Sequence, residues 1–128
     1  MNPDNYKYHR EHTWLKLSGK EATVGITDYA QKSLGDIVYI DLPEVDKEVE
    51  AHSELGEIES TKATSSIIVP VAGKVILVND DLSDTPEIIN EDPYGKGWIA
   101  VLEIEDNSEL DDLLDASEYG KYVEEEAK

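Results

Sequence analysis

The stretch "GEIESTKATSSIIVPVAG", residues 56–73, places one lysine between two segments that read as β-strands. Before Lys62, small or apolar residues alternate with Glu57 and Glu59, so both acids should point outward from a strand. After Lys62, a run of small residues leads into alternating apolar residues that begin at Ile67. This pattern predicts a β-hairpin with Lys62 exposed at its tip.

Lys62 therefore has two possible roles. A lysine amine is a compact nucleophile on a flexible stem, and acylation would convert it into a long swinging arm. The side chains of Thr61 and Ala63 are too small to block a modifying enzyme. The alternative is an exposed lysine, one of ten in the chain, that serves only solubility. The hairpin pattern alone leaves both interpretations open.

Short strands are expected throughout the chain. Residues 12–27 read as a hairpin that turns at Ser18-Gly19. In the strand that Pro43 ends, strict alternation would place Ile37 and Tyr39 on one face. Residues 65–79 should hold two strands broken at Ala72-Gly73, where a glycine would supply positive φ or a close backbone approach. Residues 75–78 are all apolar, which predicts a strand covered on both faces, and residues 98–104 form a late strand.

Helices are fewer and shorter. Thr27 and Gly35 have the residue types of an N-cap and a C-terminal stop, so a short helix is expected between them. Thr85-Pro86 resembles the start of another helix. Ser108 is expected to cap a helix over 109–116, and a weaker helix follows over 117–128. These elements together predict an all-β barrel or sandwich with helical decoration.

Composition limits the classes of function. The chain has 128 residues, enough for one domain with a core, and it contains no cysteine. Its net charge of −19 opposes nucleic-acid binding and favours a monomer. With no run of eighteen apolar residues and no apolar N-terminal segment, we expect no membrane association and a cytoplasmic location.

An enzyme would need a nucleophile with its base, an acid–base pair, or a metal site. His9, His12 and His52 could form a three-histidine metal site only if the fold brought them together, and surface or packing roles are more common. The acidic residues are too numerous to single out a catalytic pair, and the glycines follow no phosphate-loop spacing. We therefore predict no catalytic residues and no metal.

At Lys62 the sequence resembles the lipoyl-attachment segment of the glycine cleavage system H protein family. That pattern combines Glu-Ser-x-Lys-Ala with a proline and with a glycine eleven residues after the lysine, and this chain has Glu59, Ser60, Lys62, Ala63, Pro70 and Gly73 at those places. The segments "HTWLKL", "VGITDYAQKSLGDIVYIDLPEV", "INEDPYGKGWIAVLEI" and "LLDASEYGKYVEEE" are similar to others of the family, in the same order. The resemblance covers nearly the whole chain.

The resemblance implies a mainly β fold, a flattened β-barrel or barrel-sandwich hybrid like that of lipoyl domains, with short helices that include C-terminal ones. It implies a single lipoyl-carrier domain over 1–128, an attachment hairpin around 55–71 and a C-terminal helical segment around 108–126. Lys62 would carry lipoate, with Glu59, Ser60, Thr61 and Ala63 forming the attachment hairpin.

The implied function is that of a non-catalytic carrier. Its lipoyl disulfide would accept an aminomethyl group from glycine at a pyridoxal-phosphate-dependent glycine decarboxylase (P protein). An aminomethyltransferase (T protein) would pass the methylene to tetrahydrofolate, and dihydrolipoamide dehydrogenase (L protein) would restore the disulfide. A lipoate-attaching enzyme would be a fourth partner. The alternative within the family is a lipoyl relay that donates lipoate to other enzymes.

Two further details refine this expectation. Biotinyl carriers place methionines beside the lysine, whereas this chain has Thr61 and Ala63 there, so biotin is not expected. The family often reads His-Glu-Trp near the N-terminus, with the glutamate lining the cleft for the loaded arm. This chain reads His12-Thr13-Trp14, so position 13 carries no charge, and whether neighbouring Glu11 compensates stays open.

Overall fold

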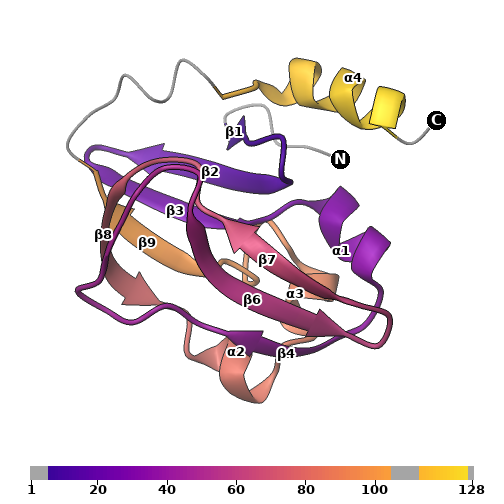
Figure 1. Ribbon diagram of the computed structural model, residues 1–128, viewed down its shortest axis with the longest axis horizontal. Helices are drawn as coiled ribbons and strands as arrows, with labels where there is room; N and C mark the ends of the chain where they lie inside the picture. Colours follow the sequence, from indigo (N-terminus) through magenta and orange to yellow (C-terminus); the bar gives the residue numbers. More distant parts are fainter. Residues whose placement is uncertain (1–5, 105–112, 127–128) are drawn as a thin grey trace.

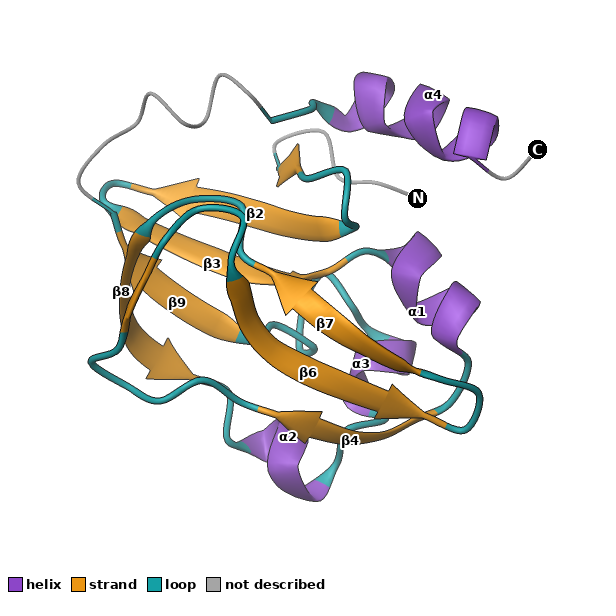
Figure 2. Ribbon diagram, viewed as in Figure 1, coloured by secondary structure: helices purple, strands orange, loops and turns teal. Residues whose placement is uncertain are grey.

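Two antiparallel sheets make up most of the structure, a computed structural model that describes residues 6–104 and 113–126 (Figures 1 and 2). One sheet has six strands, in the order β1 (Lys7–Tyr8), β2 (Thr13–Ser18), β3 (Glu21–Ile26), β9 (Ala100–Glu103), β8 (Gly73–Val78) and β5 (Glu48–Val49). The other has three, in the order β4 (Ile37–Asp41), β6 (Glu54–Ser60) and β7 (Thr64–Ile68). The prediction of a mainly β, flattened barrel-sandwich fold is confirmed.

Aliphatic side chains from both sheets form the main core. Buried residues of β2, β3 and β9 pack with buried residues of β6 and β7, among them Leu15, Val24, Ile58, Ile67 and Leu102. Alternation along half-buried strands produces this arrangement because every second side chain points to the same face. The core therefore joins the hairpin that carries Lys62 to the larger sheet.

The first hairpin and helix α1 (Asp28–Leu34) form as their local signals predict. Strands β2 and β3 pair in register from Thr13↔Ile26 to Ser18↔Glu21. The Thr27 hydroxyl accepts the Ala30 N–H at 3.2 Å, and Gly35 ends the helix with φ +81°. Only glycine adopts that backbone conformation readily, so the end of the helix is fixed by the sequence.

A second, aromatic cluster lies beneath the C-terminal helix α4 (Ala116–Glu126). Tyr8 and Tyr119 stack with their ring centroids 4.9 Å apart, and Trp14 is 1% exposed. The Trp14 indole donates to the Pro93 carbonyl at 2.9 Å. This cluster packs α4 against β1 at the N-terminal side of the molecule (Figure 1).

Two predictions about the faces of strands are wrong, and both strands contain a register shift. In β4, Tyr39 is 54% exposed while Ile37 and Ile40 are buried, because the register of β4 against β6 shifts between residues 37 and 39. In β8, the prediction that residues 75–78 are covered on both faces is wrong, because Leu77 is 52% exposed; the register of β8 against β9 shifts between residues 75 and 77. An extra residue in one strand reverses the alternation that follows it.

The helix expected to start at Thr85-Pro86 is also wrong in its bounds. Helix α2 (Asp81–Asp84), which the sequence patterns did not predict, ends with Thr85 as its C-cap. Helix α3 (Ile88–Glu91) begins three residues later, after Glu87. Ser108 and residues 109–112 of the helix expected over 109–116 lie outside the described residues. Residues 113–115 are not helical, because Leu114 forms a β-bridge with Tyr8, so this part of the prediction is wrong. The helix expected over 117–128 is confirmed by α4 as far as Glu126.

Gly73 offers a direct test of packing between β8 and β9. Its φ is not in the left-handed range, so that part of the expectation is wrong, but the close approach is confirmed. A Cβ added there would lie 2.7 Å from the Glu103 carbonyl oxygen. We therefore expect Gly73→Ala to lower the free energy of unfolding by about 1–3 kcal/mol, measured by urea denaturation.

Gly120→Ala is the matched control. No heavy atom lies within 4 Å of a Cβ added at this helical glycine, so the same chemical change should be neutral or stabilising. Equal stability of Gly73→Ala and the wild type would show that the close approach does not limit this position.

Candidate functional site

Lys62 lies between β6 and β7 and is exposed, as the sequence predicts. Figure 1 shows the turn that joins these two strands. The last paired residues of the two strands are Glu59 and Thr64. The flanking side chains of Thr61 and Ala63 are also exposed. Within the described parts of the chain, no carboxylate forms an ion pair with the Lys62 ammonium, so its amine is accessible for reaction.

Ser60 holds the backbone of this turn. Its N–H donates to the Ala63 carbonyl at 2.8 Å, and its hydroxyl donates to the same carbonyl at 3.1 Å. The hydroxyl oxygen also accepts the N–H groups of Lys62 at 3.2 Å and Ala63 at 3.0 Å. A serine at this position can satisfy several backbone groups at once, which gives the lysine a rigid base.

The turn is fastened to the loop between α1 and β4. The Thr61 N–H donates to the Asp36 carbonyl at 3.0 Å. The Lys62 stem passes over Gly35, where an added Cβ would lie 3.1 Å from the lysine Cδ. Gly35 therefore serves two purposes, because it ends α1 with a positive φ and leaves room for the lysine.

The side chain of Asn90 in α3 forms hydrogen bonds that hold this loop. The sequence patterns did not indicate this role of Asn90. Its amide donates to the Gly35 carbonyl and to Gln31 Oε1, both at 2.9 Å. Its Oδ1 accepts the Ile37 N–H at 2.9 Å. All three partners lie more than fifty residues away in sequence, so no local pattern could have indicated this role.

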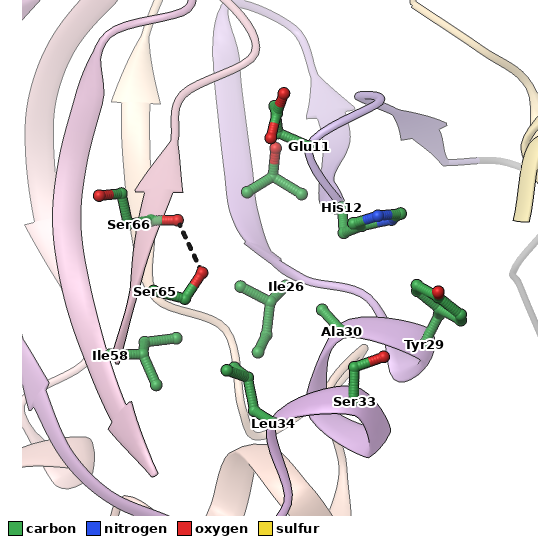
Figure 3. A pocket seen from close by; sticks show the side chains of 11 residues that line it. Glu11, His12, Ile26, Tyr29, Ala30, Ser33, Leu34, Ile58, Ser65 and Ser66 are labelled. Atoms are coloured by element: carbon green, nitrogen blue, oxygen red, sulfur yellow. Dashed lines mark hydrogen bonds between the residues drawn. The ribbon is translucent and has the colours of Figure 1, made fainter. Parts of the chain in front are cut away.

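A cavity of about 120 Å³ lies between the β6–β7 hairpin and α1 (Figure 3). Its lining includes Ser65, three residues after Lys62 in the sequence. The inner lining is aliphatic, and hydroxyl groups and two side chains of the N-terminal segment complete it. The lining residues are Glu11, His12, Thr13, Ile26, Tyr29, Ala30, Ser33, Leu34, Ile58, Ser65 and Ser66.

Thr13 and Glu11 contribute to this cavity in different ways. Thr13 is only 1% exposed, and its hydroxyl donates to the Ile68 carbonyl at 2.8 Å, which links β2 to the end of β7. Glu11 is exposed in the turn that precedes β2, at the edge of the cavity (Figure 3). Position 13 therefore has no carboxylate, but Glu11, two residues earlier, places one at the edge of the cavity.

His12 joins the cavity wall to α4 through hydrogen bonds. Its Nε2 lies 2.9 Å from a carboxylate oxygen of Glu126, and its Nδ1 lies 2.7 Å from the Tyr119 hydroxyl. The Tyr119 hydroxyl in turn lies 2.7 Å from Thr27 Oγ1 at the start of α1. Burial raises the pKa of Tyr119, so this hydroxyl keeps its proton and can donate to His12. The sequence patterns did not indicate this network.

The three histidines do not come together as one site. His9 Nε2 and His52 Nδ1 lie 2.7 Å apart, whereas the His12 ring nitrogens face Tyr119 and Glu126. Across residues 6–104 and 113–126, no group of three or more histidine, aspartate or glutamate side chains is arranged to hold a metal ion. The same described residues include no helix that is long and apolar enough to cross a membrane.

Comparison with known proteins gives a consistent result. The sequence profile described as "Glycine cleavage H-protein" matches residues 6–126. The "Glycine cleavage system H protein" of Carboxydothermus hydrogenoformans is 50% identical over 126 residues, which cover 98% of this chain and 97% of that relative. "Glycine cleavage system H protein 4" of Aquifex aeolicus is 53% identical over 122 residues, covering 95% of this chain and 71% of the relative.

A solved structure agrees with these sequence relatives. The crystal structure of a glycine cleavage system H protein from Mycobacterium marinum superposes with a TM-score of 0.82 at 33% sequence identity. The match covers 98% of this chain and 99% of the other. The similarity therefore includes both sheets and the region of the hairpin and cavity.

The histidine pair predicts a dependence of stability on pH. Burial lowers the pKa of His9, and the neighbouring His52 lowers it further. The unfolded chain therefore takes up a proton near the ordinary histidine pKa of about 6.5, while the folded chain still resists it. The contribution of neutral His9 to the free energy of unfolding should be complete above that pH. It should decrease as the pH falls towards the lowered pKa of folded His9.

Urea denaturation at pH 7.5 and pH 5.5 measures this effect. The wild type should lose more stability between the two pH values than His9→Asn, in which the titrating group is gone and His12 and His52 remain. An equal loss in both proteins would show that His9 does not contribute.

Proposed function

This chain belongs to the glycine cleavage H-protein family and has the carrier role of that family in the glycine cleavage system, and from this premise we propose that Lys62 is its lipoyl-attachment residue. The observation that carries the proposal is the accessible amine of Lys62 on a turn whose backbone is held by Ser60 and by the Asp36 carbonyl. Glu59, Ser60, Thr61 and Ala63 form the attachment hairpin around it.

The residues present fit a lipoyl group. A primary amine without an ion-pair partner among the described residues can form an amide with the lipoyl carboxyl group. The cavity between the β6–β7 hairpin and α1 has aliphatic side chains from α1 and β6 that suit a hydrocarbon chain. When bound, lipoate supplies a disulfide that can accept a one-carbon amine unit and be reduced. The chain itself would hold the arm, limit its reach and shield it from water.

We infer four partner enzymes from this role. They are the glycine decarboxylase (P protein), the aminomethyltransferase (T protein), dihydrolipoamide dehydrogenase (L protein) and a lipoate-attaching enzyme. The chemistry would take place in their active sites, with this protein as a non-catalytic carrier. A role as a lipoyl relay for other enzymes is not favoured, because the match to glycine cleavage H-proteins extends over nearly the whole chain.

The net negative charge of this protein suits a carrier that must bind several partner enzymes in turn. A net charge of −19 supports rapid encounter with basic surfaces, and association of that kind weakens as salt is added. Glu59 and Asp36 place part of this charge beside the turn that carries Lys62. A cytoplasmic location and a monomeric state stay predictions.

Attachment at Lys62 can be tested by mass spectrometry. Co-expressed with a lipoate-attaching enzyme, the protein should gain the mass of one lipoyl group at Lys62. Lys62→Arg should fold normally and stay unmodified, because a guanidinium keeps the charge but does not form the amide. Lys20→Arg is the matched control, since Lys20 lies at the tip of the β2–β3 hairpin and is also exposed. Lipoylation of another lysine in Lys62→Arg would refute the assignment.

The carrier role can be tested by isotope exchange. Lipoylated protein, mixed with the glycine decarboxylase of the same organism, should support exchange of labelled bicarbonate into the carboxyl group of glycine. Unmodified protein and Lys62→Arg should give only background, because neither presents the disulfide. The apparent affinity should fall as salt rises. Complete lipoylation without glycine-dependent exchange would favour the relay instead.

A further inference from the structure

Two histidines from distant parts of the chain are in direct contact through their rings. His9 begins the turn between β1 and β2, and His52 lies in the turn between β5 and β6. His9 Nε2 lies 2.7 Å from His52 Nδ1, which is a hydrogen-bonding distance and too short for two N–H groups that face each other. One of these two nitrogens therefore carries a hydrogen, and the other accepts it.

A backbone amide fixes which nitrogen carries the hydrogen. The Glu11 N–H donates to His9 Nδ1 at 2.9 Å, so this nitrogen has no hydrogen of its own. A neutral imidazole has one N–H, which in His9 must be at Nε2. His9 Nε2 therefore donates to His52 Nδ1, and a neutral His52 has its hydrogen at Nε2. In this arrangement both rings are neutral, and both Nδ1 atoms accept a hydrogen bond.

The backbone of each turn holds its histidine in place. The His9 N–H donates to the Thr13 carbonyl at 2.8 Å, and the His12 N–H donates to the His9 carbonyl at 2.9 Å. His52 has a φ of +66°, which is uncommon for a residue other than glycine, and its N–H donates to the Val69 carbonyl at 2.8 Å. A backbone conformation of this kind persists only where neighbouring contacts hold it. The contact between the rings therefore joins two fixed turns.

An added proton removes one of these hydrogen bonds. Burial disfavours a charge on His9, so the proton goes to His52, which is exposed. It enters at Nδ1, where the new N–H would face the His9 N–H across 2.7 Å. A proton at His9 Nδ1 would instead deprive the Glu11 N–H of its acceptor. The complete set of hydrogen bonds therefore exists only while both rings are neutral.

We propose that the His9–His52 pair is a pH-sensitive latch, which joins the turn before β2 to the turn before β6 while both rings are neutral and releases them on protonation. This inference goes beyond the carrier role and does not depend on a lipoyl group at Lys62. The Thr13 hydroxyl, which donates to the Ile68 carbonyl, links the same region of the two sheets but does not titrate with the histidines. Release therefore frees the turn over 9–12 without separating the sheets.

The groups around the pair set the direction of the response to pH. The charged or titratable neighbours are Arg10, Glu11 and His12 beside His9, and Glu50 and Glu54 beside His52. Burial lowers the pKa of His9, and the neighbouring His52 lowers it further. Stabilisation by the neutral pair is therefore complete above the unfolded pKa of about 6.5 and is lost as the pH falls towards the lowered pKa of folded His9. The latch is closed at neutral pH and opens in mildly acidic solution.

Nuclear magnetic resonance of the unmodified wild-type protein tests the positions of the hydrogens. At pH 7.5, correlation of the imidazole nitrogens with the ring protons should show His9 and His52 as neutral rings that carry their hydrogens at Nε2. A neutral His9 with its hydrogen at Nδ1 would overturn the arrangement. This measurement needs no substitution, so it does not depend on the folding of a variant.

A double-mutant cycle measures the latch itself. The wild type, His9→Ala, His52→Ala and the double variant are unfolded in urea at pH 7.5 and at pH 5.0. At pH 7.5 the coupling between the two positions should change the equilibrium constant of unfolding by about 2- to 10-fold, the net effect of one hydrogen bond. At pH 5.0 the coupling should be lost.

His52→Asn is the matched control. Its amide oxygen can accept the His9 Nε2 hydrogen in place of Nδ1, it does not titrate, and asparagine tolerates a positive φ. A second cycle, which starts from His52→Asn and again uses His9→Ala and His52→Ala, should give the same coupling at both pH values. No coupling in the wild type at pH 7.5, equal coupling in the wild type at the two pH values, or loss of coupling at pH 5.0 in the second cycle would each overturn the latch. All these results leave the proposed attachment at Lys62 unaffected, because the protein carries no lipoyl group in either experiment.

Discussion

The three hydrogen bonds of the Asn90 side chain constrain the loop on which the rest of the candidate site depends. They hold the chain from Gln31 to Ile37, at the point where α1 ends and β4 begins. This loop supplies the carbonyl that fastens the Lys62 turn and the glycine over which the lysine stem passes. A partly buried amide that satisfies three groups at once is costly to replace, because each lost partner leaves a polar group unpaired. The position of Lys62 therefore depends on Asn90, which belongs to α3 and not to the β6–β7 hairpin or to α1.

The sequence predicts those features that depend on neighbouring residues. The hairpins form where alternating strands flank small or turn-forming residues, and α1 begins and ends at Thr27 and Gly35 because their cap geometries are local. Lys62 could be located for the same reason. The bulges in β4 and β8 could not be predicted, because they are set by the register of each strand against its partner. The Asn90 contacts depend on tertiary packing and leave no local pattern in the sequence. The same is true of the hydrogen bonds that link Glu126 to Thr27 through His12 and Tyr119.

The N-terminal segment that lines the cavity is in contact with the C-terminal helix α4. Helix α4 packs on β1 through stacked tyrosines, and its Glu126 and Tyr119 contact His12, which is itself part of the cavity wall. The turn that carries Glu11 is thus supported by His9 on one side and by α4 on the other. An apolar cavity with a charged edge requires such support, because an unsupported turn would lose the position of its charge.

The bulge in β4 also affects how molecules of this protein meet. β4 is an edge strand of the three-stranded sheet, and an edge of regular backbone amides and carbonyls can template the addition of a strand from another copy. The shift between residues 37 and 39 interrupts that regular edge, and Asp36 and Asp41 place negative charge at its two ends. β4 lies next to the strand that leads to the Lys62 turn. The irregular edge therefore disfavours the addition of a strand along β4 at high protein concentration, on the side of the sheet next to β6.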